Sequence, residues 1–493
     1  MDFIHGEDRG QTLLLPDSIE DYIDDANPVR VIDAYINSLD LLALGFLGSE
    51  LKETGRPPYN PRDLLKLYVY GYMNRIRSSR RLEQETRRNL EALWLLGKLS
   101  PDHKTIARFR QEHAQALKNV FYDFTRLCAR LDLCGKELLA VDGSKFKAVN
   151  SRRRNFTKKQ IQDNIRKIAA KIDEYLGELE SNDAAESSAS GEKTKEEIAK
   201  IIGDLQARKN RYQGYADELE RTGEKQKSLT DGDSRLMTTS SAKMDVCYNV
   251  QTAVDAQNKL IVAFEVSNQC NDKNFITPMA AKAQEILETE TITVIADAGY
   301  ESVNDILTAM GRGVEAHVAG TDFDACVPDG GDGQSGISSH HNGRCAYFAG
   351  RNIALCPMGN VLYPRSHTGR RGGRALFFNY AACKKCSCKC ASDARGRYKY
   401  EVSMAAGDFS KEYDDTGLSV RQIRVKGDGQ LLKQRKAIAE HPFGTVKRGM
   451  DAGYCLTKGL NKVPGEFALA FLAYNLKRAI NILGCGKLIA AMV

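Results

Sequence analysis

The sequence predicts a mixed α/β protein in which one sheet is flanked by helices and interrupted by insertions. Strand patterns at 243–255 and 259–267 are joined by a short polar turn, which is typical of an antiparallel hairpin. Helix and strand patterns then alternate over 276–319, which is typical of parallel strands joined by helices. A sheet with both kinds of connection is mixed.

The composition is that of a globular protein. The chain has 493 residues, of which 42% are hydrophobic and 27% charged, so it can bury a core and form several domains. No run approaches the ~20 apolar residues of a membrane span. The polar start MDFIHGEDRG does not resemble a secretory signal, so we expect a cytoplasmic protein without a membrane partner. The net charge of +7 is too small to indicate nucleic-acid binding by itself.

Residues 1–135 are predicted to form a helical DNA-binding domain. A proline-rich loop at 51–62 precedes an apolar helix at 63–73, and SPDHKTI at 100–106 has the pattern of a helix start. Short helices, a turn and an arginine-rich face are typical of helix-turn-helix-like modules. The alternative is a solvated basic surface. The candidate DNA contacts are Arg75, Arg77, Arg80, Arg81, Arg87 and Arg88.

The predicted catalytic core is discontinuous in sequence. Its first strand lies in 136–156. Residues 157–229 then carry two helices of heptad-like spacing around a polar linker, which predicts an antiparallel coiled-coil hairpin. We interpret this hairpin as a structural insertion in preference to a DNA contact. The core continues in 230–319 and ends with the helices of 425–493, while 320–424 forms a cysteine-rich insertion.

Three acidic residues are candidate metal ligands. Asp142 lies inside the strand LLAVDGSKF, and Asp297 directly follows the apolar strand ITVIA. A carboxylate there is costly unless it is paired or bound to a cation. Together with Glu440 on a C-terminal helix, these acids suit a pair of Mg²⁺ ions that would stabilise the attacking and leaving oxygens of a phosphoryl transfer. Taken singly, Asp142 also fits a turn residue and Asp297 a helix cap.

Lysines accompany Glu440 at helical spacing. On one continuous helix they would share its face, which would surround a metal ligand with phosphate-binding cations. Pro442 lies within this segment, so the helix must either kink or restart there. The shared face requires the kinked, continuous form. The candidate DNA contacts of the core are Lys145, Lys433, Lys436 and Lys447.

Five motifs together cover much of the chain. They are SPDHKTIARFR (100–110), AVDGSKFKAVNS (140–151), YNVQTAVD (248–255), VIADAGYES (294–302) and AEHPFGTVKR (439–448). In this combination the sequence resembles the DDE transposases of bacterial insertion sequences. Each motif alone has modest specificity, and the set is highly specific. The resemblance implies an RNase H-like mixed sheet as the catalytic core, preceded by a helical N-terminal DNA-binding domain.

The resemblance also implies residue roles and chemistry. The catalytic acids of the family correspond to Asp142, Asp297 and Glu440. The tyrosine and arginine that accompany the family's glutamate are Lys433 and Lys436 here, whereas its lysine is kept as Lys447. Mg²⁺ or Mn²⁺ is the implied cofactor. The implied reaction is cleavage at terminal inverted repeats, after which a 3′-hydroxyl attacks target DNA without a covalent enzyme–DNA intermediate. Pairing two ends implies a homodimer on DNA.

The cysteines predict a second metal site. CKKCSCKC at 383–390 contains a C-x2-C pair, which together with Cys356 in a C-P-x-G turn fits a structural, tetrahedral zinc site. Cys388 is an alternative ligand, and a reduced cysteine-rich loop without metal is the alternative interpretation. The preferred ligands are Cys356, Cys383, Cys386 and Cys390.

Two other functions are compatible with these motifs. One is an RNase H-like DNA nuclease, and the other is a domesticated transposase that acts only as a DNA-binding protein. The N-terminal module and the large insertions favour a protein that pairs two specific DNA ends. The presence of all three acids favours an active enzyme. Inverted repeats at both ends of the reading frame would support the transposase.

Overall fold

The computed structural model describes most of the chain. The helical hairpin and the N-terminal, core and C-terminal regions are nearly continuous, whereas the cysteine-rich region is described in short segments. The described residues are 18–46, 58–184, 195–239, 242–328, 335–337, 345–348, 353–364, 374–385, 401–405 and 420–492.

Helices occur throughout the chain and strands begin at residue 138. The helices are α1 (Pro28–Ser38), α2 (Pro61–Met73), α3 (Ser79–Arg88), α4 (Leu90–Leu95), α5 (His103–Glu112), α6 (Ala114–Arg130), α7 (Lys158–Ala184), α8 (Lys195–Thr222), α9 (Ile276–Leu287), α10 (Val303–Met310), α11 (Tyr380–Lys385), α12 (Gly429–Gly444), α13 (Val463–Leu483) and α14 (Cys485–Ala490). The strands of the core and of the hairpin base are β1 (Leu138–Lys147), β2 (Asn155–Thr157), β3 (Gln226–Ser228), β4 (Arg235–Thr238), β5 (Met244–Asp255), β6 (Ile261–Ser267), β7 (Ile292–Ala296) and β8 (Val314–Val318). The strands of the cysteine-rich region are β9 (Asp322–Pro328), β10 (Ser335–Ile337), β11 (Ala346–Phe348), β12 (Ile353–Leu355), β13 (Val361–Pro364), β14 (Arg374–Phe378), β15 (Glu401–Ala405) and β16 (Val420–Lys426).

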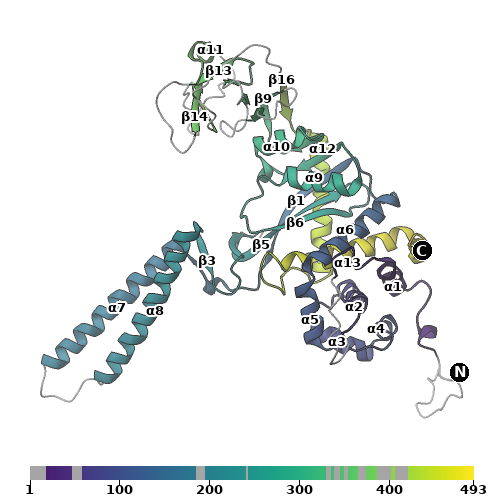
Figure 1. The fold of residues 1–493 in the computed structure, drawn as a ribbon, viewed down its shortest axis with the longest axis horizontal. Helices are drawn as coiled ribbons and strands as arrows, with labels where there is room; N and C mark the ends of the chain where they lie inside the picture. Colours follow the sequence, from purple (N-terminus) through teal and green to yellow (C-terminus); the bar gives the residue numbers. More distant parts are fainter. Residues whose placement is uncertain are drawn as a thin grey trace, which may run out of the picture.

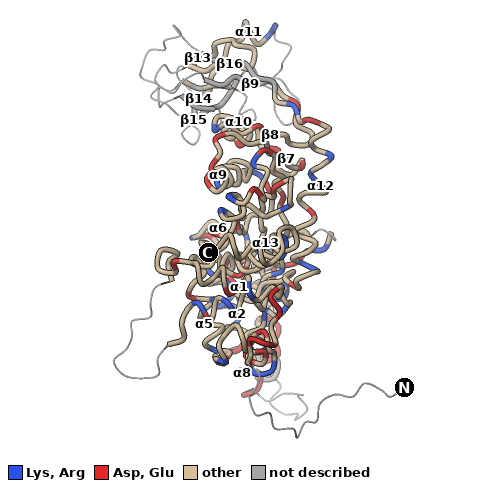
Figure 2. The backbone as a smooth tube through the Cα atoms, turned by 90° about the vertical axis from the view of Figure 1, so that its right-hand side faces the viewer, with Lys and Arg blue, Asp and Glu red and all other residues tan. Residues whose placement is uncertain are grey.

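The central sheet confirms the predicted fold class. Its order is β4-β5-β1-β7-β8, with β6 also pairing with β5. Strand β1 runs antiparallel to β5 and parallel to β7, and β8 runs parallel to β7. Three antiparallel strands followed by two parallel ones, with β1 at the centre, form the RNase H-like mixed sheet. Figure 2 shows α9 and α12 on opposite sides of β7 and β8.

The N-terminal helices pack on the core and share its interior. Asn60 and Asp102 cap α2 and α5 with their side chains, so α5 begins within the predicted helix start, and α2 begins at Pro61, two residues before the predicted position 63. Helix α6 packs along α13, where Phe121 meets Phe264 of β6 with ring centroids 5.1 Å apart. Phe264 in turn meets Phe471 of α13 at 5.1 Å. Aromatic contacts thus join the helical domain, the sheet and the C-terminal helix.

Helices α7 and α8 form an antiparallel hairpin that projects from the sheet (Figure 1). Its interior contains Ile168, Ile172, Ile198 and Ile202, with Tyr175 and Leu179 packed against them. The short pair β2–β3 joins the hairpin to the core. The heptad-like spacing therefore predicted two helices that pack through an apolar interior.

The cysteine-rich region contains its own small sheet. Strands β10 to β15 pair in sequence order. Strands β9 and β16, which connect this region to the core, pair with each other. A cluster of four buried residues, Ala346, Phe348, Ile353 and Leu355, gives this region a limited core. Across the described ranges, none of the helices is long and apolar enough to span a membrane.

Candidate active site

Asp142 and Asp297 lie on neighbouring strands. Ala140 of β1 pairs with Ile295 of β7 in a parallel register, and each aspartate follows its pair by two residues. The register therefore brings Asp142 of β1 near Asp297, which directly follows β7, and the charge of Asp297 helps to raise the pKa of Asp142. The sequence predicted this meeting of two acids, and the strand pairing produces it.

Asp142 is a largely buried carboxylate with incomplete charge compensation. The backbone N–H of Gly143 donates to its Oδ1 at 2.9 Å, and Nη1 of Arg435 on α12 lies 3.6 Å from its Oδ2. Burial raises the pKa of Asp142 to about 6, and the nearby Asp297 and Asp272 also raise it, while Arg435 lowers it. The site therefore favours an additional positive charge.

Asp297 also caps the short helix that follows it. Its Oδ1 accepts a hydrogen bond from the N–H of Gly299 at 2.8 Å. A Cβ atom on Gly299 would lie 2.9 Å from that oxygen, so a side chain at position 299 would displace the carboxylate. The helix-cap interpretation and the metal-ligand interpretation are compatible, because the cap uses one oxygen and fixes the orientation of the other.

Asp272 is a third acid of this site that the sequence did not reveal. It lies in the loop between β6 and α9, where no strand or helix pattern marks it. Its Oδ1 accepts hydrogen bonds from Lys145 Nζ at 2.9 Å and from the amides of Asn249 and Gln251 at 2.7 Å each. Asp272 therefore ties its loop to β1 and β5 beside the catalytic candidates. Lys145, predicted as a DNA contact, has its ammonium on this carboxylate.

Small residues make room for this network. A Cβ on Gly143 would lie 2.7 Å from Asp272 Oδ1 and 2.3 Å from Gln251 Nε2. The buried hydroxyl of Tyr300 donates to Gln251 Oε1, which extends the network to the turn after Asp297. The signal in the sequence was the glycine next to Asp142, since only glycine leaves space for the second carboxylate.

Glu440 does not join the two aspartates in this structure. It lies on the exposed side of α12, whereas Ile438, Ala439 and Phe443 of the same helix are buried against the sheet. Glu440 is five residues after Arg435, which places it ~140° around the helix from the residue that contacts Asp142. Lys433 and Lys436 are exposed on the same side as Glu440.

Lys447 departs from the predicted shared face. Helix α12 continues through Pro442, as the shared face requires, but its extension Thr445–Gly449 is a π-helix. The wider turn rotates Lys447 toward β1, where its Nζ donates to Ser144 Oγ at 2.6 Å and to the Lys145 carbonyl at 2.9 Å. Burial lowers the pKa of Lys447 to about 8. The prediction that Lys447 shares a face with Glu440 is wrong.

The donor set fits a divalent cation in chemical type. Carboxylate oxygens are the ligands that Mg²⁺ prefers, and Asp142 and Asp297 present two of them on adjacent strands. Within the described part of the chain, no three His, Cys, Asp or Glu side chains are grouped closely enough to hold an ion. The positive charge next to Asp142 comes from Arg435. Two carboxylates thus lie side by side, and among the described residues no third side chain completes a metal site with them.

Two family models match the sequence on either side of the hairpin. Residues 17–112 match the Transposase domain (DUF772), and residues 355–480 match the Transposase DDE domain. Both matched models describe transposase domains, as the resemblance in the sequence predicted. The first match contains the arginine cluster of this transposase, and the second contains Glu440 and Lys447.

The other comparisons add little to the identification. The cryo-EM structure of a piggyBac transposase synaptic complex with hairpin DNA aligns with 95% of this chain and 79% of that chain, at 8% identity and a TM-score of 0.29. A TM-score this low does not establish a common fold. The sequence has no match among curated proteins.

The arginine cluster of the transposase divides into a buried and an exposed part. Arg77 is 5% exposed, and its guanidinium donates to Glu466 at 2.5 Å and to the carbonyls of Asp451 and Tyr454. The structure therefore contradicts the prediction that Arg77 contacts DNA, because its donors are used inside the protein.

The other arginines of the cluster are exposed. Arg87 and Arg88 form ion pairs with Glu83 and Glu85 of α3, and Arg75 donates to the carbonyl of Gly449. Arg80 and Arg81 form no ion pair with any described residue, so they are the best-placed cations of α3 for a phosphate.

Two of the four predicted zinc ligands lie inside the described residues. Cys356 in the turn after β12 and Cys383 in α11 are both buried. Nearby, the Asn360 amide donates to Cys356 Sγ at 3.6 Å. Cys386 and Cys390, as well as the alternative Cys388, lie outside the described residues. The zinc site stays a prediction.

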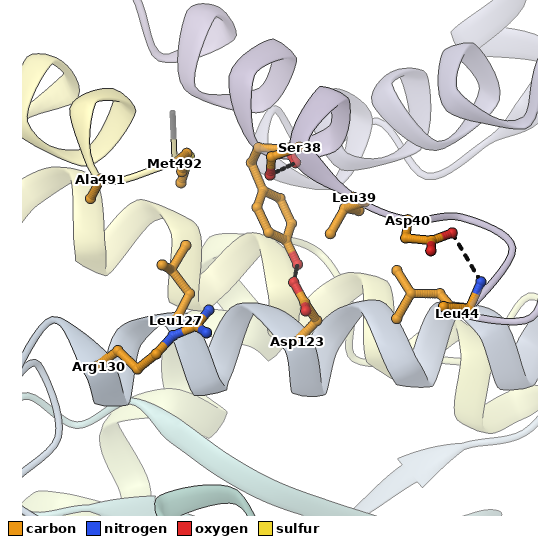
Figure 3. Close-up of a pocket in the computed structure, with 11 residues that line it drawn as sticks. Ser38, Leu39, Asp40, Leu44, Asp123, Leu127, Arg130, Ala491 and Met492 are labelled. Atoms are coloured by element: carbon orange, nitrogen blue, oxygen red, sulfur yellow. Dashed lines mark hydrogen bonds between the residues drawn. The ribbon is translucent and has the colours of Figure 1, made fainter.

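A pocket of about 330 Å³ lies away from the carboxylates, between α1, α6 and the residues after α14 (Figure 3). The Tyr35 hydroxyl donates to Asp123 Oδ2 at 3.1 Å across it. Arg130 also lines it, and Figure 3 shows that Ala491 and Met492 border the same space. The pocket contains none of the residues predicted for catalysis, so it is a feature of the contact between N-terminal and C-terminal helices.

Proposed function

We propose that this transposase binds the terminal inverted repeats of its own insertion sequence and catalyses Mg²⁺-dependent strand cleavage and transfer. The observation that carries the proposal is the side-by-side placement of Asp142 and Asp297 on the two central strands. The raised pKa of Asp142, which results from burial, supports it, since an acid that is hard to ionise gains most from a bound cation.

Each residue of the site has a proposed role. Asp142 and Asp297 would hold the metal, and Glu440 would complete the set after a movement of α12. A bound divalent ion would activate the attacking hydroxyl and stabilise the leaving oxygen. Until a metal ion is bound, Arg435 would compensate the negative charge of Asp142. Lys447 fixes β1 next to Asp142 through Ser144 and the Lys145 carbonyl. No covalent bond between enzyme and DNA is required.

The DNA ends would be positioned by cations outside the carboxylate site. We propose Arg80 and Arg81 of α3 and Lys433 and Lys436 of α12 as phosphate contacts, because all four are exposed. Two ends must be joined to one target, so the active form is proposed to be a homodimer on DNA.

The proposed function is tested with the DNA that flanks the reading frame. A labelled duplex that carries the candidate inverted repeat is incubated with the transposase and Mg²⁺, and strand ends are mapped on a sequencing gel. Cleavage at the repeat boundary, followed by joining of the 3′ end to a target plasmid, is the expected result. Cleavage without preference for the repeat would favour a nuclease. Specific binding without cleavage would favour a domesticated DNA-binding protein.

Metal binding is expected to depend on pH through Asp142. The folded-state pKa of about 6 lies above the ordinary 3.8, so folding favours the protonated acid, and this contribution is lost as pH rises through about 6. Above that pH the ionised carboxylate is available to a cation. Mn²⁺ should therefore raise the melting temperature at pH 7.5, and this increase should shrink as pH falls below about 6. Differential scanning fluorimetry with and without Mn²⁺ measures it.

The matched variant for this experiment is Asp142→Asn, which keeps the shape and removes the titration. The variant should show no Mn²⁺-dependent increase at either pH. An increase of equal size at pH 5 and pH 7.5, or one retained in Asp142→Asn, would remove Asp142 from the metal site.

The cysteine-rich region is proposed to bind one structural zinc ion per chain. Clustered cysteines in a chain without an export signal stay reduced, and thiolates favour zinc. Cys383→Ser with Cys386→Ser should release the zinc and make 320–424 sensitive to protease while the core stays folded. Elemental analysis and limited proteolysis check both effects, with Cys270→Ser as a control at an exposed cysteine. A zinc-free wild type with unchanged protease resistance in the double variant would contradict the proposal.

A further inference from the structure

The charges of the α7–α8 hairpin are separated along its length. The part near the core, here called the proximal half, comprises 158–171 of α7 and 205–222 of α8. The distal half comprises 172–184 and 195–204. The distal half has eight acids and two lysines, whereas the proximal half has nine cations and four acids, Asp163, Asp217, Glu218 and Glu220. The cations of the proximal half are Lys158, Lys159, Arg166, Lys167, Lys171, Arg208, Lys209, Arg211 and Arg221.

The two segments of the proximal half lie at the same level of the hairpin. Lys158 Nζ lies 3.1 Å from Glu220 at the hairpin base, and the helices run antiparallel from there. Residues 207–220 are therefore opposite 158–171 of α7. The exposed run Arg152-Arg153-Arg154 precedes β2 and α7. The basic residues thus gather at the base of the hairpin.

Most acids around this surface are paired with cations, and Asp217 accepts a hydrogen bond from the Gln213 amide at 3.0 Å. Asp163 binds Arg166, Glu220 binds Lys158, and Glu218 binds Lys227. Glu224 binds Arg235. The remaining cations form no ion pair with a described residue. All of them are exposed except Lys209, which is half-buried. They are Arg152, Arg153, Arg154, Lys159, Lys167, Lys171, Lys209 and Arg211.

A coiled coil gains nothing from this arrangement. Its stability depends on the buried isoleucines, and like charges at neighbouring helical positions destabilise it. A polyanion would offset that repulsion. Duplex DNA carries one negative charge per ~1.7 Å of its axis, and its phosphates would meet cations at the base and acids toward the tip. The charge separation therefore confines a duplex to the proximal half.

We propose that the proximal half of the hairpin, together with Arg152-Arg153-Arg154, is a DNA-binding surface that contacts the phosphate backbone of the duplex engaged at the carboxylate site. This inference rests on the proposed function. The hairpin is thus an additional DNA contact, where the sequence alone favoured a structural insertion.

The carboxylate site and the basic residues lie on consecutive elements of the chain. Strand β1 carries Asp142 and ends at Lys147, and α7 begins at Lys158.

The hairpin is also held in place at its base, so it presents a fixed surface. Strands β2 and β3 pair with each other, and the Gln226 side chain of β3 accepts a hydrogen bond from the backbone N–H of Leu236 in β4 of the central sheet at 2.8 Å.

The salt dependence of binding tests this surface. The full-length protein is titrated against a fluorescein-labelled 40-base-pair duplex of mixed sequence, without divalent metal, at several KCl concentrations. Lys167→Gln with Lys171→Gln should weaken binding by about 10-fold or more near 0.1 M salt and reduce the log–log salt slope by up to ~1.8. The matched control is Lys195→Gln with Lys200→Gln, which removes the same charge from the distal half. This control should leave affinity and slope unchanged.

Each outcome decides the inference. An unchanged slope in the proximal variant, while the wild type binds, overturns the hairpin surface and leaves the proposed function intact. An equal loss in the distal control also overturns it, because net charge would then explain the effect. If sedimentation shows that the proximal variant changes oligomeric state with an unchanged slope, the surface belongs to a second copy of the chain. Failure of the wild type to bind DNA would overturn both proposals. Far-UV circular dichroism of both variants confirms that the substitutions leave the helices folded.

Discussion

Asp142→Asn and Asp297→Asn are each expected to lower strand cleavage by at least ~10³-fold while DNA binding is kept, since removal of a group that acts directly on the reacting atoms has effects of this order. Asp142 lies on β1, and Asp297 directly follows the neighbouring strand β7. Asparagine keeps the shape and can still accept a hydrogen bond, so the Gly143 and Gly299 contacts can form. What is lost is the negative charge that a metal ion requires.

The control is Glu265→Gln, which removes a carboxylate from β6 of the same sheet. Glu265 pairs with Lys118 of α6 at 3.1 Å and is outside the network around Asp142. It should cut DNA at the wild-type rate. The measurement is the initial rate of cleavage of an end-containing duplex in Mg²⁺, with binding followed by fluorescence anisotropy in Ca²⁺. Near wild-type cleavage by Asp297→Asn would exclude that residue from the mechanism.

A comparison of Glu440→Gln with Asp272→Asn identifies which residue is the third catalytic acid. Glu440 is exposed in this structure, so the transposase must reposition α12 if that residue is to act. Asp272 already lies near both aspartates and is fixed by three donors. A loss of cleavage in Glu440→Gln, with binding kept, implies a movement of α12 when DNA binds. If Glu440→Gln cuts normally and Asp272→Asn does not, the third acid comes from the β6–α9 loop.

Two candidate catalytic residues, Asp142 and Asp297, could be predicted from the strand patterns of the sequence. Asp142 interrupts an apolar strand and Asp297 ends one, so each was visible from local pattern alone. Their meeting requires the parallel pairing of β1 and β7, which the RNase H-like sheet implied by the family resemblance contains. Asp272 was missed because it belongs to neither a strand nor a helix. Its three donors come from Lys145, Asn249 and Gln251, which are distant in sequence.

Helix α12 shows a second limit of sequence patterns. A period of 3.6 residues places Lys447 on the face of Glu440, and it also places Arg435 on another face. The π-helical turn at Thr445–Gly449 adds one residue to a turn and moves Lys447 to β1. No residue type in that segment predicts such a turn. The arrangement follows from packing against the sheet, which local spacing does not contain.

The arginine cluster shows a third limit. Six arginines in fourteen positions predicted a basic surface, and composition does not reveal which of them is buried. The partner of Arg77 is Glu466, which is 389 residues away in sequence. Only the tertiary structure brings the loop after α2 against α13. Arg77 therefore joins the helical domain to the C-terminal helix, while its neighbours face solvent.

Arg77→Ala is expected to destabilise the transposase by about 3–5 kcal/mol, the cost of leaving one partner of a buried ion pair uncompensated. Glu466 is 2% exposed and would keep only its hydrogen bonds from the backbone of Leu456 and from Thr457. Urea unfolding is followed by the fluorescence of Trp94, the single tryptophan, which lies in α4 of the helical domain. Arg80→Ala, at an exposed position of α3, is the matched control and should change stability by less than ~0.5 kcal/mol.

A double variant separates the charge of Arg77 from its contacts. Arg77→Met with Glu466→Met replaces the pair by apolar side chains, and it should recover a large part of the stability that Arg77→Ala loses, because no buried charge is then left unpaired. The DNA salt slope adds a second criterion. It should be unchanged in Arg77→Ala at a temperature where the variant is folded, and reduced by ~0.9 in Arg80→Ala if that cation meets a phosphate. A lower slope in Arg77→Ala with wild-type stability would return Arg77 to the DNA-binding surface.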